Sequence, residues 1–555
     1  MIYSTKILSQ TIVELCRIKG IDHIVISPGS RNAPLIVGFT SHDFFTCYSI
    51  VDERCAAFFA LGMAQQLQKP VALVCTSGSA ALNYYPAIAE AFYSDIPLVV
   101  LTADRPSHLI DIGDGQTIRQ EHVFANHIEY NANCKEGEEF QEYNETEINI
   151  ALNCAFEKQG PVHINLPFSE PLYGRTDVLS IQPKEIRTNP FEDTIEDKKL
   201  QTLAKKWNQS KKKIILIGVL QPNSIEEKYL EILANDDSVI VFTETTSNVH
   251  HTHFFPSIDQ LISSLTSEEF RNLQPDILVT LGGMIVSKRI KAFLRNYSPK
   301  EHWHIGRKEA NNTFFALTER IKCSPNHFFE SFLPQITAVQ TNYQTLWLSI
   351  KDHKLQKHVI FEKKAPYSDF LVYQAIFNSI PKTNILQLAN STAIRYAQLF
   401  SLDASSQVFC NRGTSGIDGS TSTAIGAAVK SNNPTVFVTG DLSFFYDSNA
   451  LWNNYIPNTF RIILVNNRGG GIFRILPHAK EVAHFENYFE TRHTLTAKHI
   501  CKMFGFEYAT ANSLDSVKSQ LEDFYTLSEN PKLLEIFTPS DVNDIVLKEY
   551  FKAIS

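Results

Sequence analysis

Short apolar runs alternate with helical stretches from the start of the chain to its end. Five such runs come first, HIVISPGS, FFTCYSIVDE, VALVCTSGS, IPLVVLTAD and GPVHINLPF, each followed by polar or helical sequence. The alternation returns in IILIGVL, SVIVFTE, PDILVTLGG and EHWHIG, and again in TNILQLANS, SSQVFCNRG, TVFVTGD, RIILVNN and KLLEIFTP. Because β-branched runs that alternate with helices are typical of parallel sheets covered on both faces, the pattern predicts an α/β protein.

Two changes in composition divide this pattern into three parts. From Thr176 to about Lys211 the sequence is charged and polar, which predicts a linker and the first helix of a second domain. A second break falls in a helical region at about 325–365, rich in Gln, Lys and aromatic residues. We therefore expect three doubly wound domains with mostly parallel sheets, at residues 1–178, 179–350 and 351–555.

The composition excludes several protein classes. A chain of 555 residues exceeds one hydrophobic core, and 43% hydrophobic with 20% charged residues excludes disorder, collagen and coiled coils. No apolar window reaches the ~18 residues of a membrane span, and the start reads as an amphipathic helix ending at Gly20, so we expect neither secretion nor membrane insertion. The nine cysteines form no Cys-x-x-Cys pair and mostly lie in apolar runs, which suits a reducing cytoplasm.

A net charge of −8 is opposite to the basic footprint of a nucleic-acid binder. An anionic substrate must therefore meet a local cluster of basic residues. The candidates lie beside glycine, proline and serine turns, at Arg31, Arg105 and Arg412. Guanidinium groups bind carboxylates bidentately, so these positions favour carboxylate substrates over a surface ion-pair role. For Arg119, outside these turns, we prefer the surface ion pair.

The ends of two predicted strands carry the strongest chemical signal. TVFVTGDLSFFYDS reads as a strand, a turn at Gly440 and Asp441 and a helix, while RIILVNNRGGG reads as a strand that ends at Asn467. Gly440 permits a sharp turn, and a following helix N-terminus favours phosphate. If the strands are neighbours, Asp441, Asn467 and the carbonyl of Gly469 form an oxygen set suited to Mg²⁺ held against a diphosphate. The plain alternative is an Asp N-cap and an Asn turn.

Glu53 is the second candidate, at the end of a strand and before the apolar helix CAAFFALGMA. A carboxyl buried there has its ionised form disfavoured and its pKa raised, so that it can share a proton with a partner. The alternative is an acidic residue at a surface helix N-terminus.

These motifs resemble those of thiamine diphosphate (ThDP) enzymes. Such enzymes use a glutamate like Glu53 to protonate the aminopyrimidine ring, and Ile417 matches the bulky apolar residue that bends their cofactor. Viewed alone, such an isoleucine is more often a core residue. Further segments resemble one branch, the MenD family of 2-succinyl-5-enolpyruvyl-6-hydroxy-3-cyclohexene-1-carboxylate (SEPHCHC) synthases of menaquinone biosynthesis: SPGSRNAPL, DERCAAFFALGMA, CTSGSAALNYYPA, LTADRP, GPVHINLPFSEPLYG, RGTSGIDGSTSTAIGAA and NNRGGGIF.

The resemblance implies a ThDP-dependent transferase of three domains, pyrimidine-binding, central and diphosphate-binding. It implies decarboxylation of 2-oxoglutarate and 1,4-addition of the succinyl carbanion to isochorismate, with ThDP and Mg²⁺ or Mn²⁺ as cofactors. It also implies a homodimer or homotetramer whose sites lie across two chains. Another ThDP-dependent 2-oxoacid decarboxylase or an acetolactate synthase-like carboligase is the alternative, although neither requires so many arginines. A nicotinamide-binding Rossmann protein is disfavoured, because no Gly-x-Gly-x-x-Gly follows a strand.

By the same resemblance, individual residues receive roles. The catalytic residues are Glu53, Ser30, Arg31, Gln116, Ser391 and Arg395. The cofactor-binding residues are Glu53, Ile417, Gly440, Asp441, Leu442, Ser443, Asn467, Gly469 and Ile472, of which Asp441, Asn467 and Gly469 bind the metal. The substrate-binding residues are Arg31, Arg105, Gln116, Lys288, Arg289, Ser391, Arg395 and Arg412.

Three features depart from this pattern or compete with it. The family commonly has Asn-Gln where this chain has Gly115 and Gln116, so a polar substrate contact is either missing or supplied by Asp114. Asn411 replaces a small hydroxyl residue, with no consequence that we derive. The histidines at 250, 251 and 253 have no cysteine or acidic partner at metal-ligand spacing, so a solvated loop is favoured over a zinc site.

Overall fold

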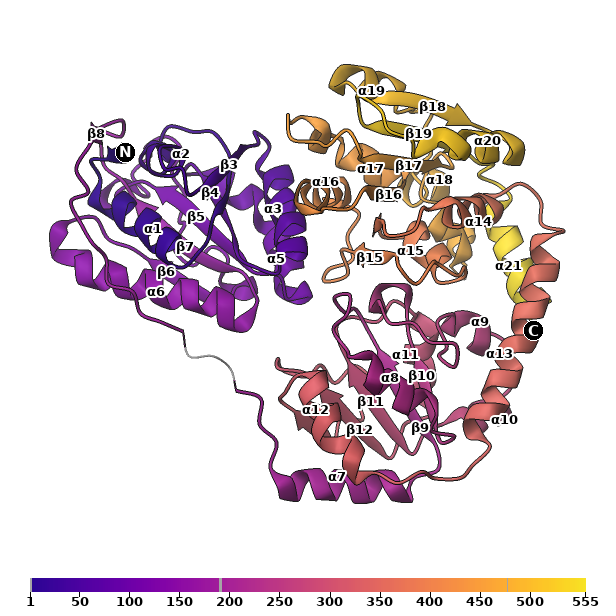
Figure 1. Cartoon of the computed structure of the whole chain (residues 1–555). Coiled ribbons are helices and arrows are strands. Elements are labelled where there is room, and N and C mark those ends of the chain that lie inside the picture. Colours follow the sequence, from indigo (N-terminus) through magenta and orange to yellow (C-terminus); the bar gives the residue numbers. More distant parts are fainter. Residues whose placement is uncertain (1, 189–191, 477) are drawn as a thin grey trace.

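The computed structural model describes residues 2–188, 192–476 and 478–555. Three lobes are visible in Figure 1, each built on its own sheet. Residues 189–191 of the expected linker lie outside the described residues. The described part of 177–196 forms no helix or strand before α7 (Asp197–Gln209) begins the second domain, as expected.

The first domain is a six-stranded parallel sheet in the order β3-β2-β4-β5-β7-β6. A short antiparallel pair, β1 with β8, joins its two ends. The strands are β1 (Tyr3–Ser4), β2 (His23–Ile26), β3 (Thr46–Ser49), β4 (Val71–Cys75), β5 (Leu98–Asp104), β6 (Tyr130–Asn133), β7 (Val162–Pro167) and β8 (Arg175–Thr176). The helices are α1 (Ile7–Ile18), α2 (Ala33–Thr40), α3 (Glu53–Leu67), α4 (Ser79–Asn83), α5 (Tyr85–Ser94) and α6 (Gln141–Lys158).

The middle domain has a five-stranded parallel sheet in the order β10-β9-β11-β12-β13. Its strands are β9 (Lys213–Ile217), β10 (Val239–Phe242), β11 (Ile277–Leu281), β12 (Glu301–Ile305) and β13 (Glu319–Ile321). With α7, its helices are α8 (Glu227–Ala234), α9 (Ile258–Ile262), α10 (Ser267–Leu273), α11 (Lys288–Asn296) and α12 (Pro325–Phe332). The expected boundary at 350 falls inside α13 (Tyr343–Glu362), which contacts β10 of the middle domain and α21 of the third.

The third domain repeats the strand order of the first. Its parallel sheet runs β15-β14-β16-β17-β19-β18. The strands are β14 (Ile385–Leu388), β15 (Gln407–Cys410), β16 (Thr435–Gly440), β17 (Arg461–Asn466), β18 (Glu507–Ala511) and β19 (Lys532–Phe537). The helices are α14 (Asp369–Ser379), α15 (Thr392–Ala397), α16 (Ser420–Lys430), α17 (Asp441–Tyr446), α18 (Phe485–Tyr488), α19 (Lys498–Phe504), α20 (Leu514–Phe524) and α21 (Asn543–Ala553).

The first and third domains share one apolar core, built where α3 packs against α16 (Figure 1). Two glycines allow the close approach. A Cβ atom at Gly62 would lie 2.0 Å from the carbonyl oxygen of Thr423, and one at Gly426 would lie 1.9 Å from that of Phe59. We expected from the resemblance that these domains meet across two chains, whereas in this structure they meet within one.

The expected α/β class with three doubly wound domains is confirmed. The amphipathic N-terminal helix is also confirmed, as α1. Eight of the nine free cysteines are buried and only Cys47 is half-buried, in agreement with their apolar surroundings. Among the described residues, no helix combines the length and the apolar run that crossing a membrane requires.

Candidate active site

The two strands that end at Asp441 and Asn467 are neighbours. β16 pairs with β17 in parallel, with Gly440 opposite Val465. Both side chains therefore lie at the carboxyl edge of one sheet, where open α/β sheets bind ligands. In the order β15-β14-β16, the chain continues to opposite sides of β14, so the ligand crevice of this sheet lies between the ends of β14 and β16. Ser391 and Asp441 follow these two ends.

Asp441 is buried and has three close neighbours. Its Oδ1 accepts the N–H of Leu442 at 2.7 Å, and its Oδ2 accepts the N–H of Gly469 at 2.9 Å. The Nε2 atom of His493 lies 3.2 Å from the same Oδ2. The structure thus brings Asp441 into direct contact with Gly469, in the turn that follows Asn467.

Two glycines, Gly440 and Gly469, lie at this edge, and they differ in whether the structure requires glycine there. Gly440 has an extended backbone with φ −92°, so the expectation that its conformational freedom makes the turn is wrong. A Cβ atom there would meet nothing within 4 Å, so space does not require glycine either. Gly469 has φ +150°, and a Cβ atom would lie 2.6 Å from the carbonyl oxygen of Glu490. Gly469 therefore requires glycine for both conformation and space.

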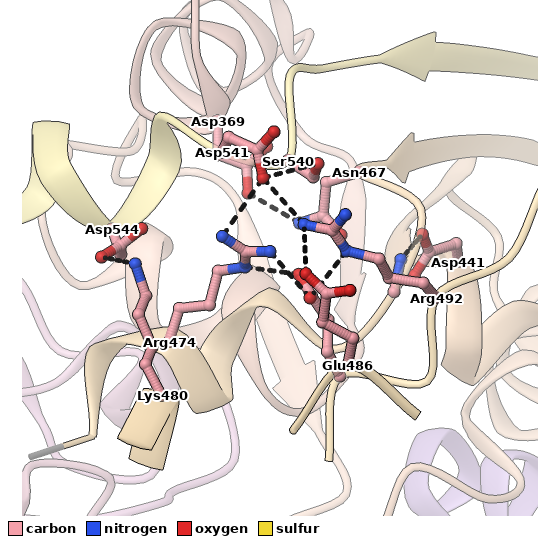
Figure 2. A network of polar contacts seen from close by, with 12 residues as sticks. Asp369, Asp441, Asn467, Arg474, Lys480, Glu486, Arg492, Ser540, Asp541 and Asp544 are labelled. Atoms are coloured by element: carbon pink, nitrogen blue, oxygen red, sulfur yellow. Dashed lines mark hydrogen bonds and ion pairs between the residues drawn. The ribbon is translucent and has the colours of Figure 1, made fainter. Parts of the chain in front are cut away.

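This donor set fits a divalent cation bound to a diphosphate. A carboxylate from Asp441, an amide oxygen from Asn467 and a carbonyl from Gly469 are hard oxygen ligands of the kind that Mg²⁺ and Mn²⁺ take. The segment between Asn467 and His493 carries Ile472 and is held by a buried carboxylate, Glu490, which pairs with Arg474 and with Arg492 (2.9 Å). The partners of this network, Asp541 among them, are drawn in Figure 2.

Ile417 and Ser443 connect the turn after β15 to α17. The Oγ of Ser443 donates to the carbonyl of Ile417 at 2.8 Å. The Ile417 side chain is 39% exposed, so the alternative that it is a core residue is excluded for this chain. A Cβ atom at Gly419 would lie 2.1 Å from the ring of Phe58 in α3, so the turn that carries Ile417 packs against that helix.

Glu53 begins α3, and Asp52 is the N-cap through the N–H of Cys55. The expected burial of the helix is confirmed, because Cys55 to Gln65 are buried. The expected burial of the carboxyl is wrong for this chain. Glu53 is half-buried, and its Oε2 accepts from Nδ2 of Asn83 at 3.4 Å, because it lies at the exposed first turn. Its neighbour Arg54 donates to the carbonyl of Tyr446 at 2.8 Å, at the end of α17.

Two predicted arginines of the first domain lie after the ends of β2 and β5. Arg31 is buried and donates to the carbonyl of Phe168 at 2.8 Å, and burial together with the nearby Arg105 lowers its pKa. Arg105 donates to the carbonyl of Gly115 at 3.0 Å and lies 3.5 Å from Asp114. Asp114, which we considered as a substitute substrate contact, is therefore the counter-ion of Arg105.

Two other predicted residues of this domain are exposed, and Arg119 is a surface residue. Ser30 and Gln116 are both exposed, and the carbonyl of Gln116 accepts from Ser77 at 2.9 Å. Arg119 pairs with Asp111 at 2.8 Å, both largely exposed, so its interpretation as a surface ion pair is confirmed.

The third domain contributes Ser391, Arg395 and Arg412. Ser391 is the N-cap of α15 with φ +71°, a strained conformation for serine, and Arg395 lies in that helix. Burial, together with the positive charge of Arg412, lowers the pKa of Arg395. Arg412 donates to Oδ1 of Asn390 at 2.7 Å, so both guanidinium groups lie at the carboxyl end of β14.

The middle domain presents Lys288 and Arg289 on the first turn of α11. Both are exposed, and the guanidinium of Arg289 lies 4.6 Å from the ring centre of Phe551 in α21. Below them, buried Glu244 accepts the N–H of Val286 at 2.6 Å and that of Ser287 at 2.7 Å. These bonds fix the start of α11 and therefore the backbone positions from which Lys288 and Arg289 extend.

Four of the predicted arginines share an unusual feature. Within the described residues, the Nε atoms of Arg31, Arg105, Arg395 and Arg412 are buried and have no hydrogen-bond partner. A buried donor without an acceptor is costly, so each of these Nε atoms indicates a missing hydrogen-bond acceptor. Dicarboxylate substrates supply acceptors of this kind.

The three histidines of the 250–253 run lie apart from this site. His251 lies 3.1 Å from Glu231, and a ring nitrogen of His253 lies 2.9 Å from the carbonyl oxygen of Ala234. Burial lowers the pKa of His250.

Comparison with known proteins agrees with this geometry. Family models match described as "Thiamine pyrophosphate enzyme, N-terminal TPP binding domain" at residues 7–130, "Middle domain of thiamine pyrophosphate" at 187–388 and the corresponding C-terminal TPP binding domain at 391–536. A protein of Flavobacterium psychrophilum named 2-succinyl-5-enolpyruvyl-6-hydroxy-3-cyclohexene-1-carboxylate synthase is 56% identical over 100% of both chains. The chain belongs to the SEPHCHC synthase family. Relatives of the same name from Flavobacterium johnsoniae (54%, 100% of both chains) and Porphyromonas gingivalis (37%, 100% of this chain and 98% of the relative) agree.

Several residues of this SEPHCHC synthase family member escaped the sequence analysis. Glu90, Glu244, Asp369, Glu490 and His493 lie beside predicted site residues but in no recognisable motif. One signal was available. Glu90 and Glu244 interrupt apolar surroundings, in PAIAEAF and VIVFTET, where a lone acidic residue indicates a specific partner.

Proposed function

We propose that this chain catalyses SEPHCHC synthesis: ThDP-dependent decarboxylation of 2-oxoglutarate and 1,4-addition of the succinyl group to isochorismate, with release of CO₂. The observation that carries the proposal is the set of four arginines with unpaired buried Nε atoms in the first and third domains, which also carry Glu53 and Asp441. Both substrates are dicarboxylates, and guanidinium groups suit them. Bound ThDP supplies the carbanion chemistry of both steps.

We propose that residues of the chain bind the metal and the cofactor and supply a proton. Asp441, Asn467 and the carbonyl of Gly469 would hold Mg²⁺ or Mn²⁺, and through it the diphosphate. Ile417, exposed beside α17, would support the middle of the cofactor. Glu53 would hold a proton on its carboxyl for the pyrimidine ring.

Substrate recognition is proposed to use residues of all three domains. Arg395 and Ser391, on α15, would hold the carboxylate of the succinyl group. Arg105 and Gln116 would serve isochorismate, and the remaining members of the set, Ser30, Arg31, Lys288, Arg289 and Arg412, would complete the anionic pocket.

The assembly is proposed to be a homodimer or a homotetramer in the cytoplasm. Exposed apolar side chains surround the start of α3, at Val51, Leu82, Tyr446 and Trp452, and such a patch favours a protein partner. Nine free thiols suit a reducing compartment.

Purified protein with ThDP, Mg²⁺, 2-oxoglutarate and isochorismate tests the proposal. We expect CO₂ release and isochorismate consumption in equal amounts. Release of CO₂ without isochorismate consumption would instead indicate a simple 2-oxoacid decarboxylase. Activity on pyruvate with no activity on 2-oxoglutarate would indicate an acetolactate synthase-like enzyme.

A further inference from the structure

The side-chain amide of Asn467 has a defined orientation. Its Nδ2 donates to Oδ2 of Asp369 at 2.9 Å, and both residues are buried. An ionised carboxylate only accepts hydrogen bonds, so the amide must turn its NH₂ group toward Asp369. Its Oδ1 is therefore the atom that remains available to a cation. Figure 2 shows Asp369 and Asn467 above Asp441, from separate segments of the third domain.

Asp369 is itself held rigidly. It is 1% exposed and stands at the first position of α14, far from Asn467 in the sequence. Its Oδ1 accepts from Oγ1 of Thr538 at 2.5 Å, and its backbone N–H donates to Oδ1 of Asn543 at 2.9 Å. The Thr538 N–H in turn donates to the carbonyl of Asn466 at 3.1 Å, which closes a ring of contacts between β17, the end of β19 and α14.

The fixed position of Asp369 matters because the side-chain amide of Asn467 has two possible orientations. An asparagine amide can turn over about its last bond, and either face has the same shape. With the NH₂ group toward Asp441, Asn467 would present a donor where the cation needs an oxygen. A fixed acceptor behind the amide removes that alternative before any cation binds.

We propose that Asp369 is a positioning residue for the metal, because it holds the amide oxygen of Asn467 toward the cation bound by Asp441. The inference rests on the proposed function only for ThDP and its metal, and not for the identity of the substrates. Partners that orient a metal ligand typically change metal affinity by about 10–100-fold when removed.

The test measures metal-dependent binding of ThDP without substrates. Full-length wild-type protein and Asp369→Ala are titrated with ThDP by calorimetry at a series of Mg²⁺ concentrations, and Mn²⁺ binding is followed by electron paramagnetic resonance. We expect the Asp369→Ala variant to need about 10–100-fold more metal for half-maximal ThDP binding. The same metal dependence in both proteins would overturn the proposal.

A conservative variant separates orientation from charge and from folding. Asp369→Asn keeps an acceptor oxygen at the same position, so we expect it to retain most of the wild-type metal affinity. Equal loss in Asp369→Asn and Asp369→Ala would overturn the proposal, because charge would then be the requirement. Asp544→Ala removes another buried acid of the same domain that pairs with Lys480 at 2.8 Å, and it should leave the metal dependence unchanged. If wild-type protein bound no ThDP at all, the proposed function would fail instead.

Discussion

The carboxylate of Glu90 in α5 accepts the backbone N–H of Gly413 at 2.7 Å and thereby joins the first domain to the third. The N–H of Thr414 donates to the same carboxylate at 2.6 Å, and its hydroxyl donates at 2.8 Å. Ser94 donates at 2.7 Å, so a carboxylate that is 1% exposed has four donors and, within the part of the chain that the structure describes, no basic partner. The turn that Glu90 holds carries Arg412 and leads to Ile417.

Replacing Glu90 with glutamine should weaken this junction. The amide NH₂ group would face at least one backbone N–H, which leaves a buried donor without an acceptor at a cost of about 1–3 kcal/mol. We expect Glu90→Gln to lower the free energy of unfolding by this amount and to raise the KM of the substrates. Denaturant unfolding and steady-state kinetics measure both effects. Ser94→Ala is the matched control, because it removes one donor and leaves both backbone contacts. An effect as large in the control would contradict the assigned role of Glu90.

Glu53→Gln should retain the fold and lose most activity. The side chain lies at the half-buried first turn of α3, so the amide is accommodated, but it cannot move the proton that the pyrimidine ring requires. Acid–base steps of this kind contribute about 10²–10⁴-fold in rate. Exchange of the thiazolium C2 proton of bound ThDP measures this step directly. A wild-type exchange rate in the variant would remove Glu53 from the mechanism.

Besides the two-residue strands β1 and β8, the sequence analysis missed one edge strand in each of the three large sheets, and these edge strands have a common physical reason. β6, β13 and β18 are edge strands of the three large sheets, and their sequences, YNAN, ERI and EYATA, are polar or short. An edge strand is covered on fewer sides and needs no continuous apolar run, so hydrophobic patterning gives little indication of it. The buried central strands, by contrast, were all predicted.

The candidate site likewise contains residues whose positions could be predicted from the sequence and residues whose positions could not. Asp441 and Asn467 follow strongly apolar neighbouring strands, so their proximity could be derived from topology alone. Glu90 and Asp369 could not be derived, because each meets its partner through domain packing across more than 90 positions of sequence. The half-buried position of Glu53 also depends on that packing, which the local apolar pattern does not contain.

Loss of Arg395 and loss of Arg105 should affect different half-reactions. Arg395 lies in the third domain beside Ser391, whereas Arg105 lies at the end of β5 in the first. We expect Arg395→Ala to slow CO₂ release from 2-oxoglutarate in a single turnover. Arg105→Ala should release CO₂ at the wild-type rate and be impaired with isochorismate. Equally slow CO₂ release in both variants would contradict this division.

The buried carboxyl of Glu244 should make stability depend on pH. Burial raises its pKa from 4.5 to about 7, so between these values the folded protein binds more protons than the unfolded chain. The free energy of unfolding contributed by Glu244 is therefore fully present below pH 4.5 and falls as pH rises toward about 7, by up to ~1.4 kcal/mol per unit.

Glu244→Gln removes this titration. Between about pH 5 and about pH 8 the urea midpoint of the wild-type protein should fall by more than that of the variant. Glu227→Gln, at an exposed position of α8, is the control and should follow the wild type. Parallel pH profiles for wild type and Glu244→Gln would contradict the assignment.

Finally, two inactive variants should complement each other if the site forms between chains. Glu53 and Asp441 lie in the first and third domains, which are joined by contacts such as Asn449 to Asp52 at 3.0 Å. Formation of the same contacts with a partner chain would place Glu53 of one chain beside Asp441 of the other. The resemblance to ThDP enzymes favours that arrangement.

We therefore expect activity to return when Glu53→Gln and Asp441→Ala proteins are mixed under conditions that allow subunit exchange. Each mixed dimer would then combine one intact first domain with one intact third domain in a single site. Exchange is verified with two affinity tags, and each variant mixed with itself is the control. If mixed dimers form and remain inactive, both halves of the site belong to one chain, as they meet in this structure, and dimer formation is not needed to complete it.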